Sequence, residues 1–269
     1  MSQRYYQTRF DNRTVRTYQH SPGGDTGQIK RRLKRPVLAC VVLFIGIIIG
    51  SSILRAHTTK ATTNSVHYSK TQTVCLDPGH GGIDPGATTS DGTITERDIN
   101  LVVALRVRQI VQNDGYRVYM TRTTNDVSLS NRDRYTYCNN QHATIMVSMH
   151  HNFFSDTSVD YTTTLFYKDE DQALAASVLA GVTAKLGTAN DGISQFQDGV
   201  LSESLMPATL CEGFFMTDSD EAALLAVKNS PRLSDEAVGI ANGIVSYFTT
   251  PKKMQPAINP NPQVIERDD

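Results

Sequence analysis

The segment Thr73–Gly82, with the sequence TVCLDPGHGG, is the strongest indication of the fold of this chain. Residues Thr73–Asp77 are a short apolar stretch that predicts a buried strand, and Pro78-Gly79 ends it. His80 follows at once, inside a glycine-rich turn. In open α/β sheets ligands bind beyond the carboxyl ends of the strands, so this turn is the first place to look for a functional side chain.

Strand-like and helix-like segments alternate after this turn. Strands are predicted at Tyr116–Thr121, Ala143–Met149, Thr162–Tyr167 and Ala208–Cys211. Helices are predicted at Glu96–Asn113, Ser130–Gln141, Asp169–Leu186, Ser219–Lys228 and Leu233–Phe248. We therefore expect one α/β domain over residues 73–248, with a mainly parallel, mixed sheet flanked by helices.

Histidine and glutamate side chains stand where these elements end or begin. The first strand runs into His80, the strand Ala143–Met149 into His150, and the strand Ala208–Cys211 into Glu212, while Glu96 begins a helix. Two imidazoles and one carboxylate suit a catalytic zinc ion, which takes three protein ligands and keeps one position for water. The second carboxylate would then stand outside the ligand set as a proton carrier.

Each of these residues also has an ordinary structural interpretation. A histidine after Pro-Gly is often only a turn residue, Glu96 suits the first turn of a helix by its charge, and Glu212 could be a solvated loop acid. His150 and His151 are adjacent, so a strand turns them to opposite sides and at most one is expected to bind a metal. The coincidence of these groups at one sheet edge favours the metal site.

The same segments resemble the zinc-dependent N-acetylmuramoyl-L-alanine amidases of the bacterial cell wall, a family with a DPGHGG opening. The resemblance covers Cys75–Tyr247 and rests on blocks that begin at Cys75 (CLDPGHGGIDPGA), Gly92 (GTITERDINL), Thr121 (TR), Leu129 (LSNR), Ser148 (SMHHN) and Pro207 (PATLCEGFF). It implies that His80, Glu96 and His150 bind Zn²⁺, with His150 rather than His151 as the second histidine. It also implies that Glu212 is catalytic, in hydrolysis of the amide between the lactyl group of N-acetylmuramic acid and L-alanine of the peptidoglycan stem peptide.

The chain departs from the family pattern in a few places. Glu96 lies four rather than three residues after Gly92, Asp218 stands where an asparagine is common, and Ser202 stands where a basic residue is common. The last two changes concern contacts with the substrate rather than the metal. The segment Phe153–Tyr161 is too short for the helix that plugs the active site of some relatives, so an open cleft is expected.

The chain before residue 73 predicts a membrane anchor. Residues Pro36–Leu54 are uncharged and rich in Val, Leu and Ile, and a helix of this length spans roughly 30 Å, the thickness of a bilayer core. The basic cluster Lys30–Arg35 places residues 1–35 in the cytoplasm and the catalytic domain on the cell-wall side of a bacterial membrane. A cleaved signal peptide is the alternative, but the leader is long and the cleavage site poor.

Charge is distributed unevenly along the chain. Residues 1–35 hold nine Lys/Arg and two Asp, which leaves 17 basic and 25 acidic residues in the rest of the chain. A basic head and an acidic body indicate two compartments rather than a nucleic-acid-binding surface. The expected partners are therefore peptidoglycan and the cytoplasmic membrane, and the sequence identifies no activator protein.

The remaining segments and the cysteines carry simpler expectations. Residues 1–35 and the proline-rich residues 249–269 are predicted to be disordered tails, and residues 55–72 a linker. Four cysteines make no disulfide framework in a chain of this length, so free, buried thiols are expected at Cys40, Cys75, Cys138 and Cys211.

Two other functions stay open from the sequence. One is a peptidoglycan-binding scaffold on the amidase fold, although such a relative would be expected to lose a ligand or the catalytic acid. The other is a zinc hydrolase that acts on a different bond, such as a peptidase or an amino-sugar deacetylase.

Overall fold

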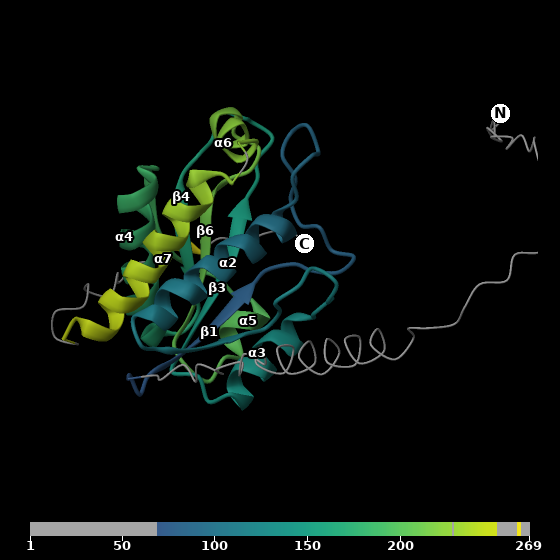
Figure 1. Cartoon of the computed structure of the whole chain (residues 1–269). Coiled ribbons are helices and arrows are strands. Elements are labelled where there is room, and N and C mark those ends of the chain that lie inside the picture. The colour runs from purple at the N-terminus through teal and green to yellow at the C-terminus, as the bar shows by residue number, and fades with distance from the viewer. Residues whose placement is uncertain (1–68, 228, 252–262, 265–269) are drawn as a thin grey trace, which may run out of the picture. The chain divides into compact units, whose positions relative to one another are not determined.

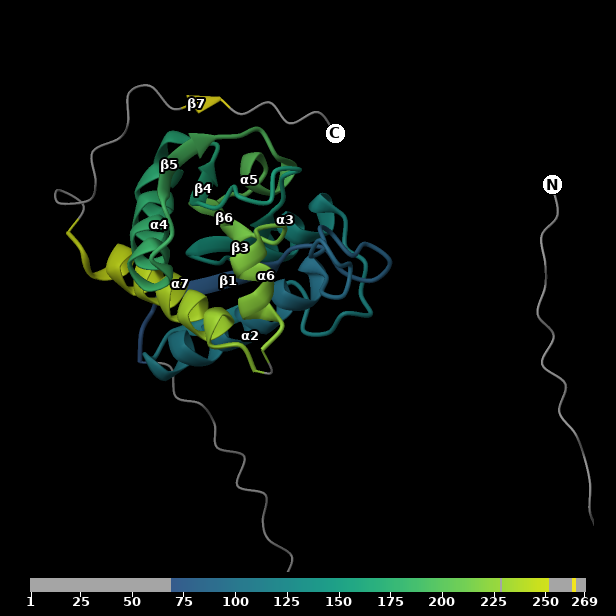
Figure 2. The ribbon, with the colours of Figure 1, turned by 90° about the horizontal axis from the view of Figure 1, so that it is seen from above.

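The strands of the described residues form one mixed sheet in the order β2-β1-β3-β6-β4-β5-β7. The strands β1, β3, β6, β4 and β5 can be followed in this order in Figure 2. The computed structural model describes residues 69–227, 229–251 and 263–264. The strands are β1 (Thr73–Pro78), β2 (Arg117–Met120), β3 (Ile145–Asn152), β4 (Thr162–Phe166), β5 (Asn190–Gln195), β6 (Ala208–Phe215) and β7 (Gln263–Val264). Within these residues every pairing is parallel except that of β4 with β6. The expected α/β domain with a mainly parallel, mixed sheet is confirmed.

Helices cover both faces of the sheet (Figures 1 and 2). They are α2 (Glu96–Asn113), α3 (Asn131–Asn140), the short 3₁₀ helix η2 (Asp169–Asp171), α4 (Gln172–Leu186), α5 (Gly199–Ser202), α6 (Ser219–Leu225) and α7 (Pro231–Thr249). The larger core cluster joins α2, α4 and α7 to one face, through residues such as Val107, Val178 and Ile240. The smaller cluster joins α3 and α5 to the other face, through Cys138 and Leu201.

Side-chain alternation along the strands separates these two cores. Val74 and Leu76 of β1 face the larger cluster, whereas Cys75 between them faces the smaller one. Both faces of the sheet are covered, so β1, β3 and β6 are buried along nearly their whole length, including polar residues such as Asp77, Ser148 and Glu212.

Two helix starts lie close to the later site and are capped by side chains. Thr95 precedes α2, and its hydroxyl accepts a hydrogen bond from the backbone N–H of Asp98. Ser130 and Asp133 form a reciprocal capping box at the start of α3. The first cap fixes where α2 begins, and therefore makes Glu96 its first residue.

Two strands are longer than the sequence predicts. β3 continues past Met149 to Asn152, and β6 continues past Cys211 to Phe215. The two extensions pair with each other, His150 with Glu212 and Asn152 with Phe215. Polar residues can remain in strand here because each extension supplies hydrogen-bond partners to the other. The strand β5 was not predicted at all, since its sequence NDGISQ lacks an apolar run.

The structure corrects the expectation that all cysteines are free. Cys75 of β1 and Cys138 of α3 form a disulfide across a sequence separation of 63 residues. The strand alternation turns Cys75 toward the face that α3 covers, so the two thiols meet although no spacing rule connects them. Cys211 is free and buried, as predicted, and Cys40 lies outside the described residues.

Several predicted segments lie outside the described residues. These are the basic tail 1–35, the anchor 36–54, residues 55–68 of the linker, and residues 252–262 and 265–269 of the C-terminal tail. Among the helices that are described, none has the length and apolar character needed to cross a membrane.

Candidate metal centre

Three side chains converge at the carboxyl end of the sheet. His80 follows β1, Glu96 begins α2, and His150 lies in β3. Nε2 of His80 lies 3.0 Å from Oε2 of Glu96, and Nδ1 of His150 lies 3.0 Å from Oε1 of the same carboxylate. One ligand atom from each residue lies within 4.8 Å of the other two, which is a spacing that one ion can bridge.

Two glycines allow the backbone to approach this cluster. A Cβ at Gly79 would lie 2.2 Å from Nε2 of His150, and a Cβ at Gly86 would lie 2.6 Å from Oε2 of Glu96. Any larger residue would therefore displace a side chain of the cluster. His80 itself has a positive φ of 60°, which the tight turn between these glycines imposes.

Hydrogen bonds from surrounding groups orient the three side chains. Asp84 Oδ2 accepts from Nδ1 of His80 at 2.8 Å, which leaves Nε2 of that ring directed toward Glu96. The backbone N–H of Ala87 donates to Oε2 of Glu96 at 2.9 Å, and the backbone N–H of His151 donates to Oε1 at 3.1 Å. Partners of this kind fix the tautomer of a ligand histidine and the orientation of a ligand carboxylate.

The electrostatics of the cluster keep the carboxylate ionised. Burial acts to raise the pKa of Glu96, but hydrogen bonds from His150 and His80 hold it well below its usual range. Burial acts to lower the pKa of His80, and the hydrogen bond and charge of Glu96 raise it instead. The cluster therefore attracts positive charge.

The donor set fits a divalent metal ion. Two imidazole nitrogens and a carboxylate oxygen match a catalytic site with three protein ligands. Glu96 is only 3% exposed, and its ionised carboxylate has no lysine or arginine among its partners in the described residues. A buried carboxylate that faces two histidines is what such an ion would require.

Glu212 stands beside the cluster without being one of the three ligand candidates. It is the register partner of His150 on the neighbouring parallel strand, so the two side chains emerge on the same face of the sheet. Glu212 is 2% exposed and lines a cleft of about 780 Å³ together with His80, Glu96 and His150. Phe196 and Asp198 also line this cleft. The four residues that the sequence singled out therefore surround one space.

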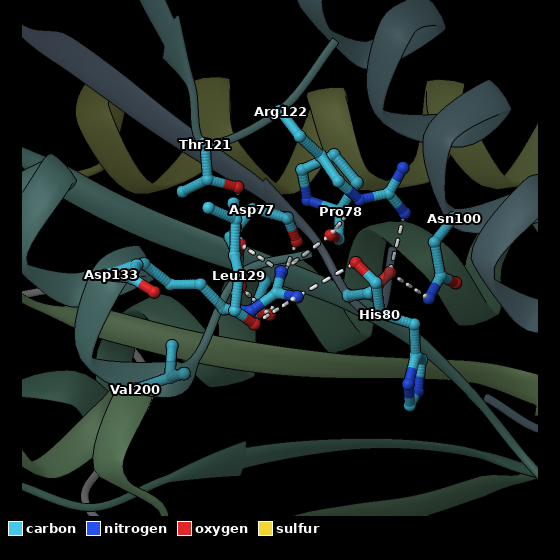
Figure 3. A network of polar contacts seen from close by, with 12 residues as sticks. Asp77, Pro78, His80, Asn100, Thr121, Arg122, Leu129, Asp133 and Val200 are labelled. Carbon is cyan, nitrogen blue, oxygen red and sulfur yellow. Dashed lines mark hydrogen bonds and ion pairs between the residues drawn. The ribbon is translucent and has the colours of Figure 1, made fainter. Parts of the chain in front are cut away.

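Buried arginines hold the turn that carries His80. Arg134 donates to Oδ1 of Asp77, to the backbone oxygen of Pro78 and to that of His80, each at 2.9 Å. Arg122, which Figure 3 shows beside Pro78, donates to the backbone oxygens of Pro78 and Gly79, at 2.9 and 2.7 Å.

The sequence drew attention to a different arginine of the same helix. The LSNR block ends at Arg132, which is exposed, whereas Arg134 two residues later is buried and holds the turn. The missed signal is the pairing of Arg134 with Asp77, which a single sequence does not display. The hydroxyl of Thr121 also donates to Oδ1 of Asp77, at 2.6 Å.

Comparison with known proteins identifies the family. A model of the N-acetylmuramoyl-L-alanine amidase family, Amidase_3, matches residues 74–246. The chain belongs to this family. The probable cell wall amidase LytH of Staphylococcus epidermidis is 27% identical over 182 residues, which are 67% of this chain and 60% of that protein. LytH of Staphylococcus aureus is 28% identical over 180 residues, and these are 66% and 59% of the two chains.

Solved structures of family members share this fold. The catalytic domain of the amidase CwlV from Paenibacillus polymyxa var. colistinus superposes with a TM-score of 0.62 at 29% identity, covering 66% of this chain and 98% of that domain. The CwlD amidase from Clostridioides difficile, solved in complex with the GerS lipoprotein, gives 0.62 at 27% identity and covers 67% and 100%. The present chain spans about 60% of the length of the staphylococcal relatives.

His151 lies on the opposite side of β3 from its neighbour, as strand alternation predicts. Its ring is buried, with Nδ1 2.7 Å from Oδ1 of Asn100 and Nε2 3.0 Å from Oε2 of Glu236 on α7. Burial acts to lower the pKa of His151, but the charge of Glu236 and the hydrogen bond to it raise the pKa. His151 therefore belongs to a second group of polar residues behind the metal centre of this amidase-family chain.

The departures from the family pattern have local consequences. Asp218 caps α6, where its Oδ1 accepts from the backbone N–H groups of Asp220 and Glu221. Ser202 ends the short helix α5. The described segment 153–161 contains no helix, in agreement with the open cleft that its length predicts.

Proposed function

We propose that this amidase-family chain is a zinc-dependent peptidoglycan hydrolase that cleaves the amide between the lactyl group of N-acetylmuramic acid and L-alanine. The supporting observation is the placement of Glu212 beside the cluster of His80, Glu96 and His150. Membership of the family and the LytH and CwlV relatives support the same substrate class.

The proposed chemistry divides the work between a metal ion and Glu212. A zinc ion held by His80, Glu96 and His150 would polarise the scissile carbonyl and lower the pKa of water to near 7. Glu212 would accept the proton of the attacking water at its carboxylate and transfer it to the nitrogen of the departing L-alanine. Asp84 would hold His80 in the tautomer whose Nε2 can bind the metal.

The test is digestion of purified peptidoglycan by the full-length protein, with the products analysed by mass spectrometry. The proposal expects stem peptides with free L-alanine amino termini, and expects them to disappear with a chelator and to return with added zinc. Unaltered peptidoglycan would instead support a binding scaffold. Products with a different new end, such as a free amino sugar, would support hydrolysis of another bond.

We also propose that the protein is held in a bacterial cytoplasmic membrane by residues 36–54, with the catalytic domain on the cell-wall side. The uncharged run and the basic cluster Lys30–Arg35 support this topology. The disulfide between Cys75 and Cys138 adds independent support, because such bonds persist in oxidising compartments outside the cytoplasm.

Cell fractionation tests this topology. The full-length chain should sediment with membranes and be digested by protease added to spheroplasts, while a variant without residues 2–54 should be absent from the membrane fraction. A full-length chain that remains in the cytosolic fraction would contradict the anchor.

A further inference from the structure

A buried polar relay lies directly behind the metal carboxylate. It consists of His151 on β3, Asn100 on α2 and Glu236 on α7, whose exposed fractions are 2%, 0% and 1%. Asn100 and Glu236 lie on α2 and α7, the helices that pack on the larger core, whereas His151 is also among the residues that line the cleft of Glu212. Three buried polar side chains at one place are costly unless each is hydrogen-bonded, so their contacts indicate what they do.

Asn100 connects this relay to Glu96. Its Nδ2 donates to Oε1 of Glu96 and to the backbone oxygen of Gly79, at 3.3 Å each. Its Oδ1 faces Nδ1 of His151 at 2.7 Å. A carboxamide rotated by 180° would place Oδ1 against two other oxygen acceptors, so only the observed orientation satisfies all three contacts.

His151 holds the carboxamide of Asn100 in the observed orientation. Since Oδ1 of Asn100 can only accept, Nδ1 of His151 must donate to it. The other ring nitrogen faces a carboxylate oxygen of Glu236 at 3.0 Å and donates there. The backbone N–H of the same histidine donates to Oε1 of Glu96. His151 thus touches the metal carboxylate through its own backbone and through Asn100.

The far end of the relay is built into the fold. Glu236 reaches from α7 to the space beside Gly213 of β6, where a Cβ would lie 2.3 Å from Oε1 of Glu236. Phe214 packs against the ring of His151, with centroids 4.3 Å apart. These contacts hold the carboxylate of Glu236 in place, and they hold the imidazole of His151 between Glu236 and Asn100.

We propose that His151, held by Glu236, is a positioning residue that orients the metal carboxylate through Asn100. It is not one of the three candidate metal ligands, which are His80, Glu96 and His150. Its role is to present Glu96 with Oε1 already oriented, so that metal binding requires little rearrangement. The inference rests on the metal centre proposed above and adds residues that lie outside its ligand set.

A double-mutant cycle on zinc affinity tests this role. The full-length variants His151→Leu, Asn100→Leu and the pair of both would be compared by competition with a chromophoric chelator. Each single change should weaken zinc binding about 10- to 100-fold, the range for outer partners of metal ligands. The double variant should be no weaker than the weaker single variant, because both changes break the same connection.

Conservative substitution provides a second measurement that does not depend on those variants folding. Gln at position 236 can still accept from Nε2 of His151, so Glu236→Gln should keep zinc affinity within about threefold, while Glu236→Ala should weaken it by about tenfold or more. The matched control is Glu221→Gln, which removes the charge of Glu221 on α6 from its ion pair with Arg232 on α7, and neither residue is among those that line the cleft. It should lower the melting temperature without changing zinc affinity.

A purely structural role gives a different result. The inference would be overturned if His151→Leu lowered the melting temperature of the chelated protein but kept wild-type zinc affinity. It would also be overturned if the two single effects multiplied in the double variant, or if Glu236→Ala bound zinc as tightly as Glu236→Gln. A wild-type protein that binds no zinc would contradict the proposed function instead, so the two failures can be told apart.

Discussion

His150 and Glu212 occupy paired positions on the neighbouring parallel strands β3 and β6. Paired residues of parallel strands project from the same face, so the backbone hydrogen bonds of the sheet hold the glutamate beside the histidine. The two residues are 62 positions apart in the chain, and their proximity depends on rigid strands rather than on loops. This arrangement suits a site in which one carboxylate binds no metal and transfers protons.

Replacing Glu212 by Gln should separate catalysis from metal binding. The amide keeps the size of the side chain but cannot accept a proton, so amidase activity should fall by about 10²- to 10⁴-fold. Zinc content, measured by atomic emission on the purified protein, should stay at the wild-type level. Wild-type product release by Glu212→Gln would exclude this residue as the proton carrier.

Asp84→Asn tests the partner of the first histidine. The amide weakens the hydrogen bond that selects the His80 tautomer, so zinc affinity should fall by about 10- to 100-fold. Chelator competition measures this change directly. The control is Asp114→Asn, which removes the same charge at the C-terminal end of α2, whereas Glu96 lies at its N-terminal end. This variant should bind zinc as tightly as the wild type. Equal affinities in the two variants would show that Asp84 does not support the metal site.

The disulfide should contribute substantially to stability. Cross-linking residues separated by 63 positions restricts the unfolded chain, by about 4 kcal/mol in the chain-entropy estimate. Denaturant unfolding of the chelated protein should therefore show a loss of about 2–5 kcal/mol when a reductant is present. The double variant Cys75→Ala/Cys138→Ala should not respond to reductant. A wild-type protein equally stable with and without reductant would argue against the bond.

Acid should destabilise the protein partly through Asp77. Burial acts to raise the pKa of this carboxyl, but the charge of Arg134 and hydrogen bonds from Thr121 and Ser148 lower it below its ordinary value of 3.8. The resulting stabilisation is complete above about pH 3.8 and is lost as the pH falls through the lowered pKa.

Asp77→Asn removes this titration. The variant should be less stable at pH 7 by about 3–5 kcal/mol, because Arg134 loses its buried partner. Between pH 4 and pH 2, its unfolding free energy should fall less steeply than that of the wild type, as measured by denaturant unfolding in the presence of a chelator. Parallel curves over this range would mean that Asp77 does not retain its charge in acid.

Much of the fold was predictable from local patterns. Apolar runs ending at Pro-Gly or in polar residues indicated β1, β3 and β6, and helical spacing indicated α2, α4 and α7. The residues of the candidate site were suggested by their positions where strands end and a helix begins, and the resemblance to the amidase family assigned their roles. These features depend on neighbours in the chain, which is why a single sequence reveals them.

Other features were decided only by tertiary structure. The extension of β3 through His150 depends on β6 running beside it, and the strand β5 depends on its pairing with β4. The packing of α3 on the sheet brings Cys138 to Cys75, where they form the disulfide. The same packing makes Arg134, rather than Arg132, the arginine that binds Asp77. In each case the partner is distant in sequence.

The adjacent residues His150 and His151 show most clearly which features the sequence determines and which the tertiary structure determines. The sequence by itself determined that His150 and His151 must face opposite sides of a strand, because side chains alternate. Tertiary structure decided what each side holds: His150 meets Glu96, and His151 meets Asn100 and Glu236 of α7. Local backbone geometry sets the alternation, whereas long-range packing sets the surroundings of each ring.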